Sequence, residues 1–212
     1  MASGLNKAPG TAQGPAGGEA TIPGQSFRQI LVTLQASCGQ QYEPLLKAAG
    51  LMRFQQTLPP DDWSPAGTAA EIARLFKVVY DMLGEDLTRL FHRNNNLAIA
   101  KFILKSPAGQ SMVAEAAQIP AGQRLGGFVR AMALSSGRTW TPHTVSEDAD
   151  AWYLTNEHCL VCAGVQGAAS PFCGSATLYA YLAKAVIGRR VRVVEVECAA
   201  MGAPHCKYAL YK

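Results

Sequence analysis

The sequence predicts an α+β fold in which helices come first and strands follow. Apolar residues recur at helical spacing from Phe27 to Ile103, whereas valine-rich stretches with strand character are found only after Gly137. Helices and strands that are segregated along the chain are typical of α+β domains. The chain has 212 residues, of which 49% are hydrophobic, and it can therefore bury the core of one domain.

We expect the chain to consist of a tail and a single domain. Residues 1–24 are rich in Gly, Ala and Pro and contain no aromatic residue. Such a segment cannot bury enough apolar surface to offset its chain entropy, so we expect it to be disordered. The domain is expected over residues 25–212, mostly helical over 25–135 and α+β, with a metal site, over 136–212.

The first half of the domain contains several segments with helical periodicity. A helical pattern is expected from Phe27, Tyr42 to Leu46 continue it, and Gly50 is placed to end it because glycine takes left-handed backbone angles without a Cβ clash. Further helices are expected, in order, over 72–83, 87–103, 112–117 and 125–134. Ser106-Pro107 would stop the second of these four.

The last third of the chain is expected to form strands around one helix. Residues 151–164 are expected to be a strand that runs into a loop, and a helix over 174–187 would end at Gly188. A valine-rich strand follows over 189–198, and a closing strand over 206–212. A turn containing glycine and proline separates these two strands, so we expect them to pair antiparallel.

Composition and charge argue against several classes of protein. The formal charge of +4 comes from scattered Lys and Arg residues, without a basic patch interleaved with aromatic residues, so nucleic-acid binding is not expected. The N-terminus lacks a signal peptide, and no apolar run is long enough to cross a bilayer. We therefore expect a cytoplasmic protein that is not integral to a membrane. Six cysteines in that compartment favour metal binding or reactive thiols over a disulfide framework.

Five of the six cysteines follow residue 157, and three of them are placed to hold a metal ion. Cys198 and Cys206 flank the expected hairpin turn, so their sulfurs can converge. Cys173 precedes a helix, where amide dipoles favour the thiolate form that ligates metals. A tetrahedral zinc ion bound by these three cysteines needs a fourth ligand. Buried thiols without a metal, or a redox dithiol, are the alternatives that the spacing leaves open.

Three residues compete for the fourth position. Cys162 lies in a glycine-containing loop, and Cys159 precedes it with the Cys-x-x-Cys spacing that is common among metal ligands. Glu195 is the third, but strand alternation places its side chain on the opposite face from Cys198 unless a bulge intervenes. From the residues alone we favour Cys162.

Several motifs share a pattern with a known family. They are "CAG" at 162–164, "PFC" at 171–173, "VEVEC" at 194–198 and "AAMGAPHCKY" at 199–208. This pattern resembles the 4-vinyl reductase domain family, which is named for the bacteriochlorophyll 4-vinyl reductases. Upstream, "LLKAAGL" at 45–51 and the proline-broken stretch after it resemble the helical half of the reductase-named members. The resemblance is specific in the cysteine-rich part and looser before it.

The resemblance implies a fold, a ligand class and partners. Members share an α+β fold with small subunits of the TRAPP vesicle-tethering complex and dimerise through their helices, so a homodimer is expected. They bind small hydrophobic molecules. In aromatic-sensing transcription activators the same domain binds phenols and carries a structural zinc. The corresponding ligand here would be a tetrapyrrole intermediate of (bacterio)chlorophyll synthesis.

The resemblance also implies roles for individual residues. By position, Cys173, Cys198 and Cys206 match zinc ligands of the sensors, and Glu195 matches a fourth. The sensors lack a counterpart of Cys162, so the fourth ligand stays open, with Cys162 first, Glu195 second and Cys159 third. Trp152 matches the tryptophan of the sensors' ligand pocket. His92 and His143 are the histidines that could ligate the central metal of a tetrapyrrole.

These features favour ligand binding over catalysis. No Gly-x-Gly-x-x-Gly motif follows a strand, and neither a P-loop nor a Ser/His/Asp set is visible. The reductase activity implied by the family name therefore has no visible nicotinamide or flavin site. We expect a zinc-stabilised domain that binds or carries a tetrapyrrole at the 4-vinyl reduction step of (bacterio)chlorophyll biosynthesis, with a biosynthetic enzyme as partner. The alternative is a regulatory module that senses small aromatic molecules and acts through a separate partner; a purely structural dimer subunit is a third reading.

Overall fold

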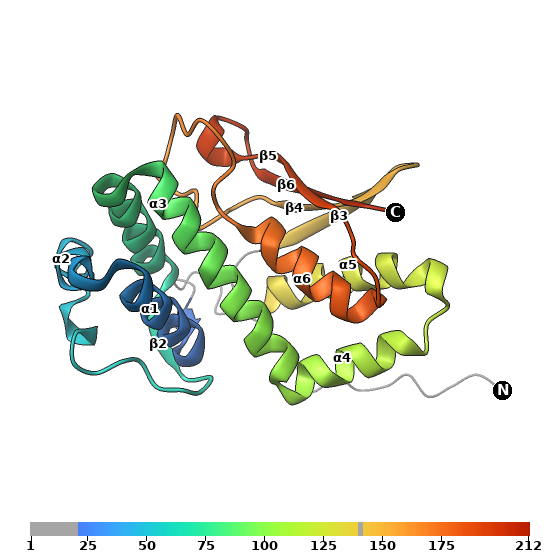
Figure 1. Cartoon of the computed structure of the whole chain (residues 1–212), viewed down its shortest axis with the longest axis horizontal. Coiled ribbons are helices and arrows are strands. Elements are labelled where there is room, and N and C mark those ends of the chain that lie inside the picture. Colours follow the sequence, from blue (N-terminus) through green and yellow to red (C-terminus); the bar gives the residue numbers. More distant parts are fainter. Residues whose placement is uncertain (1–20, 140–141) are drawn as a thin grey trace.

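Helices form one side of the molecule, and a four-stranded antiparallel sheet lies on the other (Figure 1). The computed structural model describes residues 21–139 and 142–212. The chain passes through five helices before it enters the four-stranded sheet at His143. The predicted α+β class is therefore confirmed. Residues 1–20, which make up most of the expected tail, lie outside the described residues.

The N-terminal part packs two helices against the start of a third. Strand β1 (Thr21–Pro23) pairs antiparallel with β2 (Pro65–Thr68), and α1 (Gly24–Cys38) and α2 (Tyr42–Ala48) lie between them in the chain. Strand β1 thus falls inside the segment that was expected to be tail. Gly50 has a φ of 70°, the left-handed angle expected after the end of α2. Short 3-10 turns occupy Gly39–Gln41 and Met52–Phe54.

Helix α3 (Ala69–Lys105) joins the N-terminal helices to the rest of the molecule. It begins with a capping box: the Glu71 amide donates to Thr68 Oγ1 at 3.2 Å, and the Thr68 amide donates to Glu71 Oε2 at 3.0 Å. At Gly84 the backbone leaves helical angles, with φ 76° and ψ 174°, so two helical segments meet at a kink. The two long helices that the sequence predicts on either side of this glycine are confirmed.

Two further helices follow a sharp stop at Ser106. Helix α4 (Pro107–Ala117) has proline in its first turn. Backbone amides of the first turn have no acceptor within the helix, so the amide hydrogen that proline lacks is not needed there. The Gly109 amide donates to Ser106 Oγ at 3.1 Å, which caps the helix. After a 3-10 turn at Ala121–Gln123, α5 (Arg124–Thr139) leads toward the sheet. The predicted stop at Ser106-Pro107 is therefore confirmed.

The sheet has the order β3-β4-β6-β5, and all neighbouring strands are antiparallel. Its strands are β3 (His143–Glu147), β4 (Ala151–Asn156), β5 (Val193–Glu197) and β6 (Cys206–Tyr211). Helix α6 (Ser175–Ile187) packs between the sheet and α3 and ends at Gly188, whose φ is 81°. A 3-10 turn at Ala199–Met201 lies between β5 and β6. These two strands pair antiparallel, as the sequence predicts.

Buried residues form two cores. The N-terminal core comprises Ile22, Phe27, Ile30, Leu31, Leu34, Tyr42, Leu45, Leu46, Ala49, Leu51, Phe54, Ile72, Leu75, Phe76, Val79 and Phe91. The C-terminal core comprises the buried apolar and cysteine residues that lie between Ala100 and Leu210, on α4, α5, α6, the sheet and the cysteine-bearing loops. Helix α3 contributes buried residues to both cores and therefore connects them.

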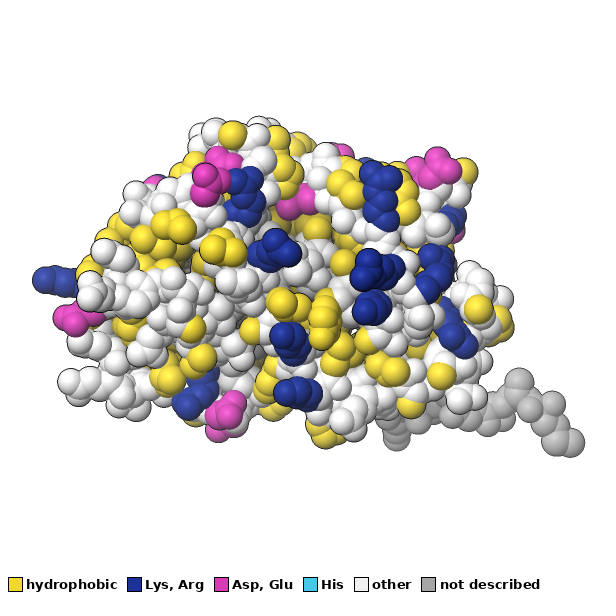
Figure 2. Space-filling view, in the orientation of Figure 1, with side chains coloured by type: hydrophobic (Ala, Val, Ile, Leu, Met, Phe, Trp, Pro, Cys, Tyr) yellow, Lys and Arg dark blue, Asp and Glu magenta, His cyan; other side chains and the backbone are white. Residues whose placement is uncertain are grey.

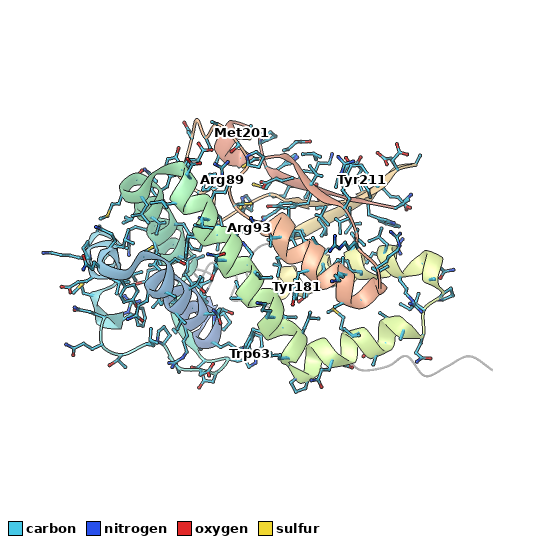
Figure 3. All side chains as sticks on the ribbon, viewed as in Figure 1. Trp63, Arg89, Arg93, Tyr181, Met201 and Tyr211 are labelled. Carbon is cyan, nitrogen blue, oxygen red and sulfur yellow. The ribbon has the colours of Figure 1, made fainter. Side chains whose placement is uncertain are left out.

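The surface over α3 and α6 is basic. Figure 2 shows several Lys and Arg side chains over these two helices and fewer Asp and Glu side chains, most of them toward the edges of the face. Arg93 from α3 and Tyr181 from α6 lie along the line where the two helices meet (Figure 3). The charges that look scattered in the sequence are therefore gathered by the packing of two helices.

Candidate functional site

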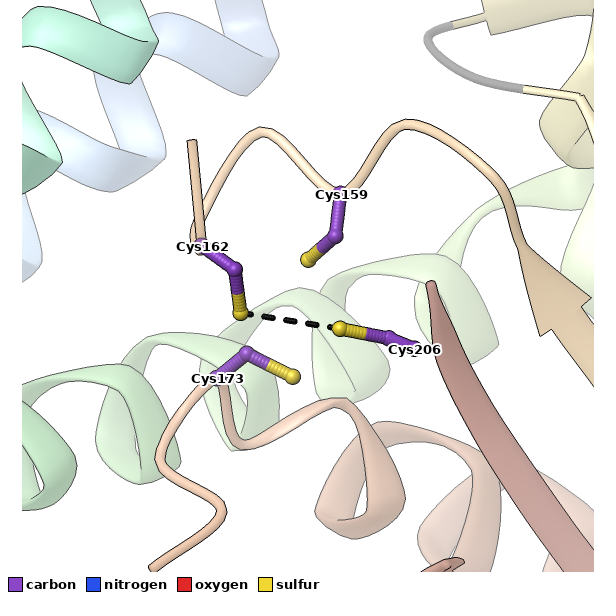
Figure 4. A group of neighbouring side chains, drawn as sticks. All are labelled: Cys159, Cys162, Cys173 and Cys206. Carbon is purple, nitrogen blue, oxygen red and sulfur yellow. Dashed lines mark hydrogen bonds between the residues drawn. The ribbon is translucent and has the colours of Figure 1, made fainter. Parts of the chain in front are cut away.

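Five cysteines converge near one end of the sheet. Cys159 and Cys162 lie in the loop after β4, Cys173 lies just before α6, Cys198 directly follows β5, and Cys206 begins β6. All five are buried. Figure 4 shows four of their sulfur atoms directed toward a shared centre. The structure thus brings together every cysteine that the sequence suggests as a ligand; with Glu195 we call them the cysteine cluster.

The spacing of the sulfur atoms is that of ligands around one ion. Cys162 Sγ lies 3.6 Å from Cys206 Sγ and 3.8 Å from Cys198 Sγ. A disulfide would need about 2.05 Å, and all these cysteines are free. Four sulfurs at about 2.3 Å from a tetrahedral centre lie about 3.8 Å apart. Two overlapping sets have all their ligand atoms within 4.8 Å of one another: Cys159, Cys162, Cys173 and Cys206, and Glu195, Cys198 and Cys206.

A β-bulge turns Glu195 toward the cysteines. In the β5–β6 register Glu195 lies opposite Tyr208 and Glu197 lies opposite Lys207, so Val196 is an extra residue. The bulge breaks the alternation that would otherwise place Glu195 and Cys198 on opposite faces. Strand alternation alone predicted the wrong side for this carboxylate, because it assumes an unbroken ladder.

Further polar side chains surround Cys173. Its Sγ lies 3.3 Å from both carboxylate oxygens of Glu195 and 2.9 Å from the hydroxyl of Tyr208. The ring of Tyr208 packs edge-on against that of Tyr179 at a centroid distance of 5.1 Å. The Tyr179 hydroxyl lies 2.9 Å from Nε2 of His143. Hydrogen bonds and one ring contact therefore connect the cysteine cluster, through Tyr208 and Tyr179, to His143 on β3.

Burial and mutual contacts raise the pKa values of some groups in the cysteine cluster and lower those of others. Burial, followed by the charges of Cys173 and Cys198, raises the pKa of Glu195 to about 11. Hydrogen bonds, led by that from Cys162, lower the pKa of Cys198 to about 3. Hydrogen bonds led by that from Cys159 lower the pKa of Cys173 well below its usual range and raise that of Cys162. Some of these groups therefore hold negative charge while their neighbours are kept neutral by it.

The described residues supply no cation beside that charge. Within residues 21–139 and 142–212, no Lys or Arg side chain forms a hydrogen bond or ion pair with a member of the cysteine cluster. Buried thiolates without a counter-ion are strongly disfavoured. A bound cation would satisfy the charge, and sulfur-rich sites select soft metal ions. The arrangement is therefore chemically suited to a thiolate-ligated metal.

The cysteine cluster has an opening to the surface. A hollow of about 270 Å³ is lined by Cys159 and Cys162 together with Glu157, His158 and Ala199. The other ligands lie deeper, since Cys173 and Cys206 have no exposed surface. An ion could enter past the Cys159–Cys162 loop and meet the deeper sulfurs behind it.

A buried histidine forms a second unusual feature. His92 on α3 has no exposed surface, and neither ring nitrogen has a hydrogen-bond partner among the described residues. Its ring lies against those of Phe76, Phe91 and Phe172, at centroid distances of 4.8, 5.0 and 5.8 Å. Burial lowers the pKa of His92 to about 4, against an opposing effect of the charge on Cys173. This histidine is therefore neutral and unsatisfied.

Trp152 lies apart from both features. Its ring packs against Gly126 of α5, where an added Cβ would come within 2.6 Å of it. The Arg130 guanidinium stacks over the same ring at 4.6 Å from the centroid. Trp152 lines neither of the two surface hollows described for this chain. Its role in a ligand pocket stays a prediction.

Comparison with known proteins shows a similar fold but does not assign the chain to a family. No protein-family model matches the chain, and no curated protein matches its sequence. An H-NOX structure from a study of heme distortion in that family is 14% identical, with a TM-score of 0.54 over 90% of this chain and 93% of the other. The H-NOX protein of S. oneidensis in its Fe(II)NO state is 13% identical, with a TM-score of 0.53 over 90% and 99%.

A weaker likeness is found to a sensory domain. The phenol-responsive sensory domain of the transcription activator PoxR, solved with phenol, is 18% identical, with a TM-score of 0.44 over 82% of this chain and 90% of the other. At this level of similarity it adds nothing to the fold assignment.

Three expectations from the sequence are wrong. The similar folds are those of H-NOX domains, so membership of the 4-vinyl reductase domain family is not supported. The expected role in (bacterio)chlorophyll biosynthesis, and with it a part in photosynthesis, is likewise not supported. The expected structural zinc and tetrapyrrole intermediate are corrected too, since the H-NOX neighbours reported above are described with heme and with Fe(II)NO. Clustered thiols do not identify zinc, because soft thiolates also suit Cu(I) and iron–sulfur centres.

The helices of the described residues give one further result. None of them combines the length and the apolar composition needed to cross a membrane. Taken together, the comparisons and the structure support one statement of likeness: the chain has an α+β fold similar to that of H-NOX domains.

Proposed function

We propose that this chain is a small-molecule-sensing domain that acts through a separate partner. The observation that carries the proposal is His92, a fully buried histidine whose two ring nitrogens lack partners. A buried polar group without a hydrogen bond costs about 1–3 kcal/mol. A ligand that hydrogen-bonds to this ring would recover that energy. The likeness to H-NOX folds, described with heme and NO, supports the sensing class.

The position of His92 suits a sensor. Phe76 and Phe91 belong to the N-terminal core, and Phe172 belongs to the C-terminal core. The ring of His92 therefore lies where the two cores meet. Phe172 directly precedes Cys173, and the Asn96 amide group joins the carbonyls of His92 and Cys173, at 2.9 and 3.0 Å. A ligand that moves Phe172 would consequently displace the start of α6.

Heme does not fit beside His92 in this structure. An axial heme ligand needs a ring nitrogen that faces an open apolar slot wide enough for the porphyrin. Here three phenyl rings lie within 5.8 Å of the imidazole centroid, and the ring has no exposed surface. Neither of the surface hollows described here is lined by His92. We therefore derive no step through heme.

The chemistry of the enclosure indicates the class of ligand. Aromatic side chains surround the histidine, so a ligand would be apolar. It would also be small, because it must take the space that one of these rings now occupies. One hydroxyl or similar group would bond to the neutral imidazole, which can donate from one nitrogen and accept at the other. A small phenol has both properties. A charged ligand would lack a countercharge in this apolar setting.

Titration with phenol tests the proposal. Phenol should shift the ring-nitrogen NMR resonances of His92 and raise the melting temperature of the full chain. His92→Phe should abolish both effects, whereas His158→Gln, at an exposed histidine, should preserve them. Phenol binding that persists in His92→Phe would overturn the assignment. A His92-dependent Soret band after addition of hemin would overturn the exclusion of heme.

We also infer that the cysteine cluster holds one soft metal ion with a structural role. We assign Cys162, Cys173, Cys198 and Cys206 as its ligands, with Glu195 and then Cys159 as alternatives for the fourth place. The sulfur spacing and the lack of a protein cation among the described residues support this assignment. Both overlapping sets contain Cys206, so its loss should be the most damaging.

Cobalt(II) provides a spectroscopic probe of this site. Addition of Co(II) to the reduced, metal-free chain should give thiolate-to-metal charge-transfer bands that saturate at about one ion per chain. Cys206→Ser should lose these bands, whereas Cys38→Ser should keep them, because Cys38 lies on α1 outside the cluster. Separate Glu195→Gln, Cys159→Ser and Cys162→Ser variants decide the fourth ligand. A chain that binds no cobalt would refute the metal site.

A further inference from the structure

A basic groove lies between α3 and α6, and neither His92 nor any member of the cysteine cluster lines it. It has a volume of about 410 Å³ and is open along the surface. Three cationic side chains line it: Arg93 from α3, Lys184 from α6 and Arg190 from the loop after α6. All three are exposed, and none forms a hydrogen bond or ion pair through its side chain within the described part of the chain. The groove therefore presents uncompensated positive charge.

The sequence segments that form the groove are poor in acidic residues. No Asp or Glu occurs over residues 158–194, a stretch that holds all of α6 and the loop after it. Over residues 87–146 Glu115 is the one acidic residue, and it lies on α4. Figure 2 shows the resulting surface, with Lys and Arg side chains over α6 and few acidic side chains among them. Charge complementarity therefore calls for an anionic occupant.

The groove also has apolar and hydroxyl-bearing walls. Val191 is buried beneath it, and Tyr181 lies on its rim with 38% of its surface exposed. Figure 3 shows Tyr181 and Arg93 on the two helices that border the groove. Thr177 adds a hydroxyl group on the same side of α6. An occupant with carboxylates alone would leave this apolar surface unused.

The shape of the groove distinguishes a peptide from a small anion. Thr177 and Lys184 lie seven residues apart on α6, which corresponds to about 10 Å along the helix. A small ligand is normally enclosed over most of its surface, whereas this groove is open. A row of contacts of this length suits about two turns of a helix, or a short extended strand, with acidic and apolar side chains.

We propose that the α3–α6 groove docks an acidic, partly apolar peptide segment of a partner protein. Carboxylates of the segment would pair with Arg93, Lys184 and Arg190, and an apolar side chain would pack on Val191 and Tyr181. This inference does not depend on the ligand of His92 or on a metal in the cysteine cluster.

Fluorescence anisotropy with a labelled peptide tests the proposal. The probe is a peptide of about twelve residues that alternates pairs of glutamates and leucines, which is about three helical turns. The full chain should bind it, and Lys184→Glu should weaken binding about tenfold. Lys47→Glu is the matched control, because Lys47 is also an exposed helical lysine but lies on α2. Arg190→Glu gives a second groove variant, and circular dichroism checks that all variants are folded.

Three results would overturn the assignment. Equal weakening by Lys47→Glu and Lys184→Glu would show that binding follows net charge and not the groove. Stronger binding of a single-stranded oligonucleotide than of the peptide, lost in Lys184→Glu, would make the groove a nucleic-acid site. Inorganic pyrophosphate that shifts the NMR signals of Arg93 and Lys184, with no peptide binding, would make it a small-anion site.

Discussion

The two cores of this molecule are held together by different interactions. The N-terminal core consists of aliphatic and aromatic side chains from helices whose apolar residues recur at regular spacing. The C-terminal core contains five buried thiols beside the half-buried carboxyl group of Glu195, and these groups come from the loop after β4, the residue before α6, the end of β5 and the start of β6. Burial of apolar surface suffices for the first. The second buries groups that acquire charge, and it needs a cation to balance them.

This difference gives each core its own dependence on conditions. Apolar packing responds to side-chain volume and is indifferent to metal, thiol oxidation and moderate changes of pH. A thiolate site responds to all three, because its ligands must be deprotonated and reduced. His92, between the cores, belongs fully to neither, since it is buried among phenyl rings but carries unsatisfied nitrogens.

Metal removal should give the largest difference in stability between the two cores. Apparent binding free energies at thiolate sites are on the order of 10 kcal/mol at neutral pH, and this energy is linked to folding. A chelator, or Cys206→Ser, should therefore expose the amides of β5, β6 and α6 to hydrogen exchange while α1 and α2 stay protected. Mass spectrometry of the exchanged peptides measures this difference. Cys38→Ser should leave the pattern unchanged, and uniform loss of protection across both cores would contradict the comparison.

A cavity in the N-terminal core should give the next largest effect. Leu46 has no exposed surface, so Leu46→Ala should destabilise the chain by about 2–5 kcal/mol. Urea unfolding measures the change. The loss should be the same with and without chelator, because no member of the cysteine cluster belongs to this core. A loss that depends on chelator would show that the cores are one cooperative unit.

Sequence reasoning is reliable where the cause of structure is local. The helix stop at Ser106-Pro107, the glycine ends at Gly50 and Gly188, and the break near Gly84 follow from backbone preferences of a few residues. Strand β3 (His143–Glu147) was not predicted, because only one of its five residues is aliphatic and none is buried; its pairing with β4 makes it a strand. Local sequence patterns predict helices and strands with strong preferences of their own. They do not predict a strand such as β3, which depends on pairing with a neighbouring strand.

The candidate sites show the same limit. The sequence suggests all the clustered cysteines from their spacing, but it cannot show the bulge at Val196 that turns Glu195 toward them. His92 is distinguishable as unsatisfied only once Phe76, Phe91 and Phe172 are seen to enclose it. The basic groove likewise forms only when α6 packs against α3, because Arg93 and Lys184 are far apart in the chain. Contacts between distant segments decide each of these features.

His92→Phe should stabilise the junction between the cores. It removes two buried nitrogens without partners, each of which carries a desolvation penalty, so we expect a gain of about 1–3 kcal/mol at neutral pH. Burial holds the folded pKa of His92 at about 4, below its unfolded value of about 6.5. Between these values the unfolded chain binds more protons, so stability falls as pH drops from about 6.5 to 4. This part of the pH dependence should vanish in His92→Phe, as urea unfolding across that range would show. An equal slope in both proteins would contradict a neutral, buried His92.

The smallest effect should come from the capping box at the start of α3. Thr68→Ala removes the oxygen that accepts from the Glu71 amide, and this should cost about 1 kcal/mol. Thr68→Ser retains an oxygen at the same place and should recover most of the loss, so the pair separates the hydrogen bond from the side-chain volume. The loss concerns the N-terminal segment of α3, which packs in the N-terminal core, and should leave cobalt binding unchanged. Weaker cobalt binding in Thr68→Ala would mean that α3 transmits strain past the kink at Gly84, and the two cores would then have to be treated as coupled.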